Sequence, residues 1–168
     1  MHSIIRFRFV TLGIALSGLA AAGVDAQVRR AQPGRSQVQV TIELKIGPDA
    51  LKAAGSGACT HAPQASIYDV RAQLRAVRFA VSGQSVQLSF WDPLDGSEDM
   101  FTLAASTGTN ARSVSTVRGG NAKGSGTAVF EPAGKGGTFR IDARTADGIP
   151  IAGTIKCDAF TPHVAEGG

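Results

Sequence analysis

Two short stretches near the end of the chain decide its fold: TFRIDART at residues 138–145 and IAGTIKC at residues 151–157. In both, apolar and polar side chains alternate, which is typical of a β-strand with one buried face. Asp147-Gly148 lies between them and favours a turn. A shared buried face needs a loop with an odd number of residues, such as 147–149. The sequence therefore predicts a closing hairpin whose inward residues are Phe139, Ile141, Ala143, Gly153, Ile155 and Cys157.

The same alternation recurs earlier in the chain. Residues 37–46 alternate throughout, and shorter strands are expected around 86–90, 101–103, 113–118 and 124–131. Pairing Val81 with Val86, and Phe130 with Phe139, leaves Gly83-Gln84 and Gly134-Lys135 as two-residue turns with glycine first. Residues 48–54 begin with proline and precede Gly55, so one or two helical turns are expected there.

The segment 68–81 carries a break in its pattern. Apolar residues occupy even positions up to Ala76 and odd positions from Val77 onward. Either a β-bulge lies near Ala76-Val77 or two strands meet there.

These patterns predict an all-β domain. Seven to nine short strands, regular turn signals and almost no helix favour an antiparallel β-sandwich of immunoglobulin-like size, with a barrel as the alternative. Residues 37–160 would form this single domain, after a flexible leader at 27–36 and before a loose tail at 161–168. The pattern is that of a small exported bacterial module, and likeness at the level of fold carries no function.

The first 26 residues have the features of a signal peptide. Arg6 and Arg8 precede an apolar run at 9–23 that is too short to span a bilayer, and small residues at 24–26 suit cleavage before Gln27. Cleavage would leave 142 residues with a formal net charge of +3 and no membrane anchor. The protein is therefore expected in a periplasm or outside the cell.

The only two cysteines, Cys59 and Cys157, both lie in the part expected to be exported. Because that compartment is oxidising, the sequence predicts a Cys59–Cys157 disulfide. A catalytic thiol is disfavoured, since neither cysteine belongs to a Cys-x-x-Cys motif.

Several functional classes have little support. The mild charge and the lack of basic runs with interleaved aromatics argue against nucleic-acid binding. No Gly-x-Ser-x-Gly occurs, and in residues 119–126 (GGNAKGSG) the lysine precedes the glycine where a phosphate loop needs Gly-Lys-Ser/Thr. No catalytic set is recognised, and the protein is expected not to be an enzyme.

Two metal sites are weighed against plain exposed loops. The predicted disulfide would bring His61 near His163 and Asp158, ligands that suit zinc or copper. Asp92, Asp95, Glu98 and Asp99 gather carboxylates in one loop, as calcium prefers, although the spacing is not that of an EF-hand. No other cofactor is expected.

Trp91 offers a candidate binding surface. With Phe90 inward, Trp91 would face outward with Gln87 and Ser89, near Arg78 on the preceding strand. Alternatively residues 48–54 or the region of Tyr68 cover it, or the sheet changes phase at Pro93.

The leading hypothesis is an exported, non-enzymatic binding or structural module whose partner is a protein or a carbohydrate. A zinc or copper protein using His61 and His163 is the second hypothesis, and an inhibitor of an exported enzyme is the third. The sequence alone does not choose the ligand.

Overall fold

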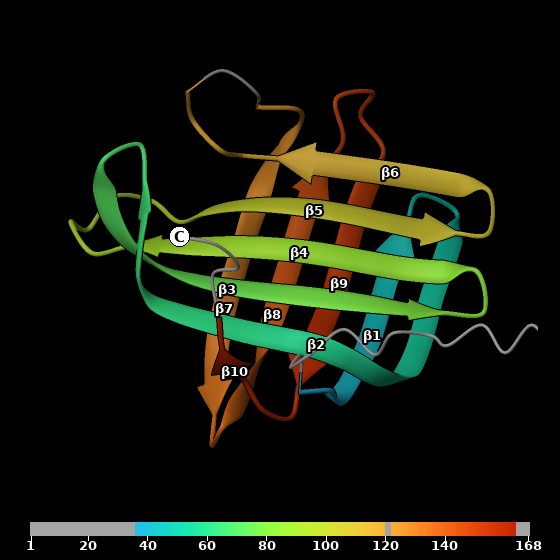
Figure 1. Ribbon diagram of the computed structural model, residues 1–168. Helices are drawn as coiled ribbons and strands as arrows, with labels where there is room; N and C mark the ends of the chain where they lie inside the picture. Colours follow the sequence, from blue (N-terminus) through green and yellow to red (C-terminus); the bar gives the residue numbers. More distant parts are fainter. Residues whose placement is uncertain (1–35, 120–121, 164–168) are drawn as a thin grey trace, which may run out of the picture. The chain divides into compact units, whose positions relative to one another are not determined.

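The computed structural model describes residues 36–119 and 122–163 (Figure 1). This part of the chain forms ten strands and no helix. Residues 1–35, which include the predicted signal peptide and nearly all of the leader, lie outside the described residues, as do residues 164–168. Among the described residues no helix is long and apolar enough to cross a membrane. The strands are β1 (Val38–Ile46), β2 (Asp49–Ile67), β3 (Val70–Val81), β4 (Gln84–Pro93), β5 (Met100–Thr107), β6 (Asn110–Ser115), β7 (Ser125–Ala133), β8 (Gly136–Arg144), β9 (Pro150–Cys157) and β10 (Thr161–Pro162).

The strands form one continuous antiparallel sheet that curls on itself. Its order is β6-β5-β4-β3-β2-β1-β9-β8-β7, and β10 pairs with β2 outside this path. The long strand β2 pairs with β1 through its first half and with β3 through its second half. In Figure 1 the strands β3–β6 cross in front of β1 and β7–β9, and β2 continues from one layer into the other.

The two ends of this sheet almost meet. Ser115, at the end of β6, exchanges two backbone hydrogen bonds of 2.8 Å with Lys123, just before β7. The result is a nearly closed barrel, so the all-β antiparallel prediction is confirmed in its barrel alternative. Alternating side chains fill the interior, among them Val40, Ile42, Leu44, Leu51, Val77, Phe79, Leu88, Phe90, Leu103, Phe139, Ile141 and Ile155.

The closing hairpin has the predicted faces. In β8 and β9, Phe139 pairs with Ile155 and Ile141 with Gly153, all toward the core. The loop is odd, as predicted, but it spans the five residues between Arg144 and Pro150. Thr145 closes the base of this loop, because its N–H donates to the Ile149 carbonyl (3.0 Å). The Cys59–Cys157 disulfide is present, as predicted.

The helical expectation for residues 48–54 is wrong. The chain turns at Gly47-Pro48 and enters β2 at once, with Ile46 opposite Asp49. Leu51 then lies opposite Leu44, and both are buried. Burial of this cross-strand pair outweighs the local preference for a helical turn.

The predicted β3–β4 turn is shifted by one residue. Val81 pairs with Gln84, so the turn residues are Ser82 and Gly83 rather than Gly83 and Gln84. Both have positive φ (47° and 77°), as a type I′ turn requires. The partner of Val81 is therefore Gln84 instead of Val86, two positions away. A shift by an even number leaves each side chain on its predicted face of the sheet but changes its partner on the other strand. The β7–β8 turn at Gly134-Lys135 and the Phe130–Phe139 pair are as predicted.

No bulge or strand junction occurs at Ala76-Val77. β3 pairs with β4 without interruption from Ala72 to Val81. The irregularity lies in β2, between Ala62 and Ala65. The start of the expected loose tail also differs, because Thr161 and Pro162 pair with Thr60 and His61 of β2 as the strand β10.

Candidate functional site

Two polar residues of β3 face the interior of the barrel. Arg75 pairs with the buried Phe90, and Gln73 pairs with Asp92, in register with the buried Val77–Leu88 pair. Since side chains on a strand alternate, Gln73, Arg75 and Val77 share the inner face. The side chain of Arg75 is only 13% exposed. Burying a cation costs free energy unless it is paired and hydrogen-bonded, so the contacts of Arg75 matter for stability.

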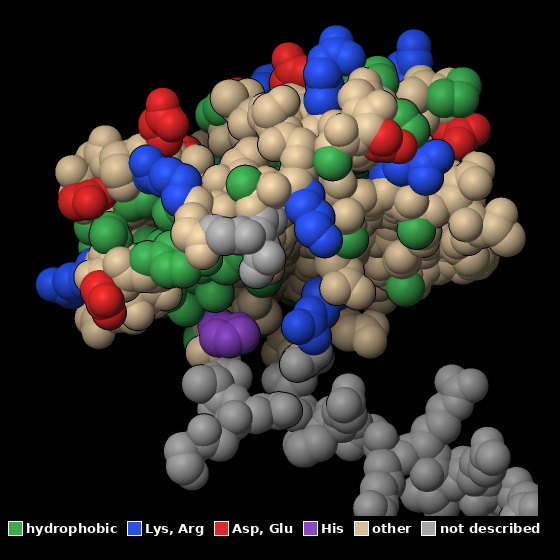
Figure 2. All heavy atoms as spheres, turned by 90° about the horizontal axis from the view of Figure 1, so that it is seen from above, with side chains coloured by type: hydrophobic (Ala, Val, Ile, Leu, Met, Phe, Trp, Pro, Cys, Tyr) green, Lys and Arg blue, Asp and Glu red, His purple; other side chains and the backbone are tan. Residues whose placement is uncertain are grey.

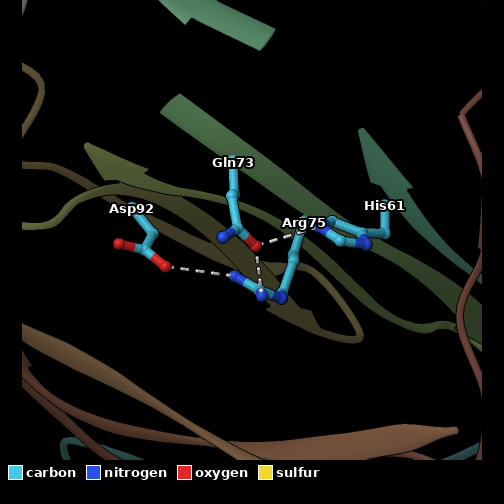
Figure 3. A network of polar contacts seen from close by, with 4 residues as sticks. All are labelled: His61, Gln73, Arg75 and Asp92. Carbon is cyan, nitrogen blue, oxygen red and sulfur yellow. Dashed lines mark hydrogen bonds and ion pairs between the residues drawn. The ribbon is translucent and has the colours of Figure 1, made fainter. Parts of the chain in front are cut away.

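Arg75 belongs to a network with His61, Gln73 and Asp92 (Figure 3). Arg75 Nη2 donates to Gln73 Oε1 (2.7 Å), and His61 Nε2 lies 3.2 Å from the same oxygen. A guanidinium can only donate, so the amide atom between them is the oxygen, and His61 must donate through Nε2. Arg75 Nη1 lies 3.6 Å from Asp92 Oδ2, an ion pair without a hydrogen bond.

An aromatic cluster supports the network. The guanidinium carbon of Arg75 lies 4.3 Å from the centre of the Phe130 ring, a cation–π contact. Phe130 and Phe160 meet nearly at right angles, with 5.6 Å between ring centroids. Phe139 contacts both and continues into the core through Phe90. Gly137 permits this arrangement, because a Cβ there would lie 2.5 Å from the Phe130 ring.

A cavity of about 430 Å³ opens beside this cluster, within the size range of small-ligand pockets. Three of its lining residues are basic and come from three different elements: His61 of β2, Arg75 of β3 and Lys135 of the β7–β8 turn. None of the described lining residues is acidic. The others are Pro63, Phe130, Pro132, Gly136, Phe160, Thr161 and Pro162.

Two carboxylates that lie close to lining residues in the sequence, Glu131 and Asp158, are engaged with other side chains. Arg140 Nε donates to Glu131 Oε1 (2.6 Å), and this hydrogen bond lowers the pKa of Glu131. Lys156 Nζ lies 3.5 Å from Asp158 Oδ1. The cavity is therefore lined by apolar residues and by three basic side chains, those of His61, Arg75 and Lys135.

The segment after Cys157 closes one side of the cavity. Phe160 N–H donates to the Lys135 carbonyl (2.9 Å), and Thr161 Oγ1 donates to the Cys59 carbonyl (3.2 Å). His163 N–H donates to the His61 carbonyl (3.0 Å). The disulfide thus anchors a short segment that supplies one aromatic wall and part of the rim.

The predicted Trp91 surface lies on the other side of the sheet. Arg78 pairs with Gln87, as neighbours on the outer face, but Ser89 faces Ala76 and Trp91 faces Leu74 and Met100. Trp91 is partly buried. Gln87 and Ser89 line a shallow hollow of about 210 Å³ with residues of β5, β6 and Lys123. Binding at Trp91 stays a prediction.

The predicted zinc or copper site is brought together only in part. Pairing of β10 with β2 places His163 beside His61 in the backbone. Asp158 lies against Lys156, and in the described ranges no three His, Cys, Asp or Glu residues are placed to hold a metal ion. The metal-binding hypothesis stays a prediction.

The carboxylates predicted to bind calcium lie in and beside the β4–β5 connection. Asp95 Oδ1 accepts from Ser97 N–H (2.9 Å), and hydrogen bonds from Ser97 lower the pKa of Asp95. Burial and the nearby charge of Asp92 raise the pKa of Asp99. Among the described residues, no three of these carboxylates, Glu98 included, are placed to hold one metal ion. Calcium binding is likewise untested.

A second hollow, of about 440 Å³, lies beside the β2–β3 turn. It is lined mainly by apolar residues and includes Tyr68, which is 57% exposed. Figure 2 shows hydrophobic side chains gathered at this end of the molecule, bordered by acidic and basic ones. Tyr68 and Asp69 both have positive φ, a conformation that is unusual for such residues.

Sequence reasoning missed four residues of the cavity lining, Arg75, Phe130, Lys135 and Phe160, and also Gln73, which holds Arg75. A signal was present in the break of pattern at Ala76-Val77. If the inward phase set by Val77 and Phe79 is continued backward, Arg75 and Gln73 fall inside the barrel. No protein-family model, curated protein or solved structure matches this chain.

Proposed function

We propose that this protein is an exported, non-enzymatic binding protein that holds a small ligand in the cavity lined by His61, Arg75, Phe130, Lys135 and Phe160. The observation that carries the proposal is the change of character along the inner face of β3. Val77 and Phe79 are apolar core, whereas Arg75, the next inward residue, lines the cavity with its guanidinium, which Gln73 holds through a hydrogen bond. Ligand sites typically combine apolar walls with a few fixed polar groups.

The cavity is organised before any ligand arrives. Gln73 and Phe130 hold the Arg75 guanidinium from two directions, and the disulfide tethers the segment that carries Phe160. Groups held in place lose little conformational freedom on binding, which favours affinity. Thr161 carries the one hydroxyl among the described lining residues, and this hydroxyl donates its hydrogen bond to the backbone carbonyl of Cys59. This arrangement suits holding a ligand better than reacting with one.

Export is part of the proposal. The disulfide favours an oxidising compartment, in agreement with the signal-like residues 1–26. A periplasmic and an extracellular location fit equally well.

The test is a ligand screen followed by two-dimensional ¹H–¹⁵N NMR on the oxidised protein. We expect hits that shift the amide signals of His61, Phe130, Lys135 and Phe160. A Phe160→Ala variant should weaken such hits about tenfold, because an aromatic wall is lost. Leu94→Ala, an exposed apolar residue of the β4–β5 connection, is the matched control and should leave binding unchanged.

Fluorescence of Trp91, the single tryptophan, separates the two candidate surfaces. A ligand in the cavity should leave Trp91 quenching by acrylamide unchanged, whereas a glycan stacked on the outer face should reduce it. Hits that shift only signals around Trp91 or Tyr68 would refute the cavity as the binding site.

A further inference from the structure

We infer that the ligand of this cavity is a small organic anion with a flat apolar body, of which a ring-bearing carboxylate is the simplest case. This inference rests on the proposed binding function and names the ligand class.

The charge of the lining points to an anion. His61, Arg75 and Lys135 line the cavity, and none of the described lining residues offers a carboxylate. Lys135 has no ion-pair partner among the described residues. An apolar cavity with this lysine at its rim favours an anionic ligand, because the apolar walls contact the body of the ligand and the lysine contacts its charge.

Arg75 and Lys135 differ in how their charges can meet a ligand. The charge of Arg75 is largely offset by Asp92, 3.6 Å away, and its Nη1 atom is inaccessible to solvent. Arg75 therefore acts mainly by stacking on Phe130 and by orienting Gln73. Lys135 lies in the exposed turn at the rim, where its flexible side chain can reach a ligand. We therefore assign the anion's main contact to Lys135.

The shape of the walls points to a flat body. Phe130 and Phe160 stand at an interplanar angle of 82°, so a ring can stack on one and meet the edge of the other. Pro63, Pro132 and Pro162 complete rigid, apolar sides. A cavity of about 430 Å³ has the size of small-molecule sites.

The experiment compares three ligands of the same shape: 3-phenylpropionate, its neutral amide, and the cation 3-phenylpropan-1-amine. Affinities are measured by NMR titration at low salt, with the shifts mapped to the cavity. We expect the acid to bind about tenfold more tightly than the amide, because hydrogen bonds to charged groups are the stronger ones. The amine should bind more weakly than either, and added salt should weaken the acid alone.

A Lys135→Gln variant locates the charge effect. It should weaken the acid about threefold to fivefold, as expected for an exposed charge, and leave the amide unchanged. Lys45→Gln removes the same charge from an exposed position near the C-terminal end of β1, outside the cavity lining. It should change the affinity for neither ligand.

The outcomes separate this inference from the proposed function. If the amide binds in the cavity as tightly as the acid, or if Lys135→Gln weakens both equally, the anion inference is overturned while the binding function stands. If no compound of the wider screen shifts the cavity signals, the proposed function itself fails.

Discussion

Arg75 shows how one residue can set the character of a site. On one side of it along the inner face of β3 lie the apolar Val77 and Phe79, and a leucine in its place would extend that core. The chain instead keeps a guanidinium there, stacked on Phe130 and bonded to Gln73, with Asp92 nearby as counter-charge. Burying a charge with partners adds little stability over an apolar residue. Its presence is therefore better explained by a role at the cavity, which it lines.

The fold also requires the two glycines at the start of β8, Gly136 and Gly137, because a Cβ at either position would clash with neighbouring atoms. A Cβ at Gly136 would lie 2.0 Å from the Cys157 carbonyl oxygen, which is backbone and cannot move aside. We predict that Gly136→Ala destabilises the protein by about 1–3 kcal/mol, the range for overpacked sites. Gly55→Ala is the control, since its Cβ would meet Phe79 at an ordinary 3.7 Å. The free energies of unfolding of both variants are measured in urea. If Gly136→Ala proves as stable as Gly55→Ala, then β8 and β9 do not approach as closely as this contact requires.

The strands show which parts of the fold were predictable. Alternation alone located the inward faces of β1, β8 and β9, because each keeps one period over its whole length. It misled at β3, where polar residues occupy inward positions and imitate a change of phase. The helical expectation at 48–54 failed for a different reason, since the Leu44–Leu51 contact is made across a hairpin and is invisible to local propensity.

The disulfide joins the middle of β2 to the end of β9 across 98 residues. We predict that the Cys59→Ala, Cys157→Ala double variant loses about 2–5 kcal/mol of unfolding free energy, as is usual for native disulfides. Because the bond tethers the segment carrying Phe160 and β10, ligand binding in the cavity should weaken as well. Unfolding in urea and NMR titration measure the two effects. Unchanged binding in the folded variant would show that β10 holds its place without the tether.

At the scale of the whole molecule, the nearly closed barrel limits exposed edges. β6 and β7 are the ends of the sheet, and the Ser115–Lys123 bridge brings them together. This limits association with other chains, because free strand edges invite pairing. Closure of the barrel protects the strand edges, and the disulfide reduces the conformational freedom of the unfolded chain.

The proposed export can be tested with the chain that includes residues 1–26. Expressed with residues 1–26 in a bacterium that exports through a signal-peptide route, the chain should be recovered outside the cytoplasm beginning at Gln27. Intact-mass analysis should find 142 residues less two hydrogens, the mark of one disulfide. Expressed without residues 1–26 in a reducing cytoplasm, it should be recovered with free thiols and lower stability. Recovery of the exported chain with residues 1–26 still attached would contradict the signal-peptide interpretation, and free thiols in exported material would contradict the role assigned to the disulfide.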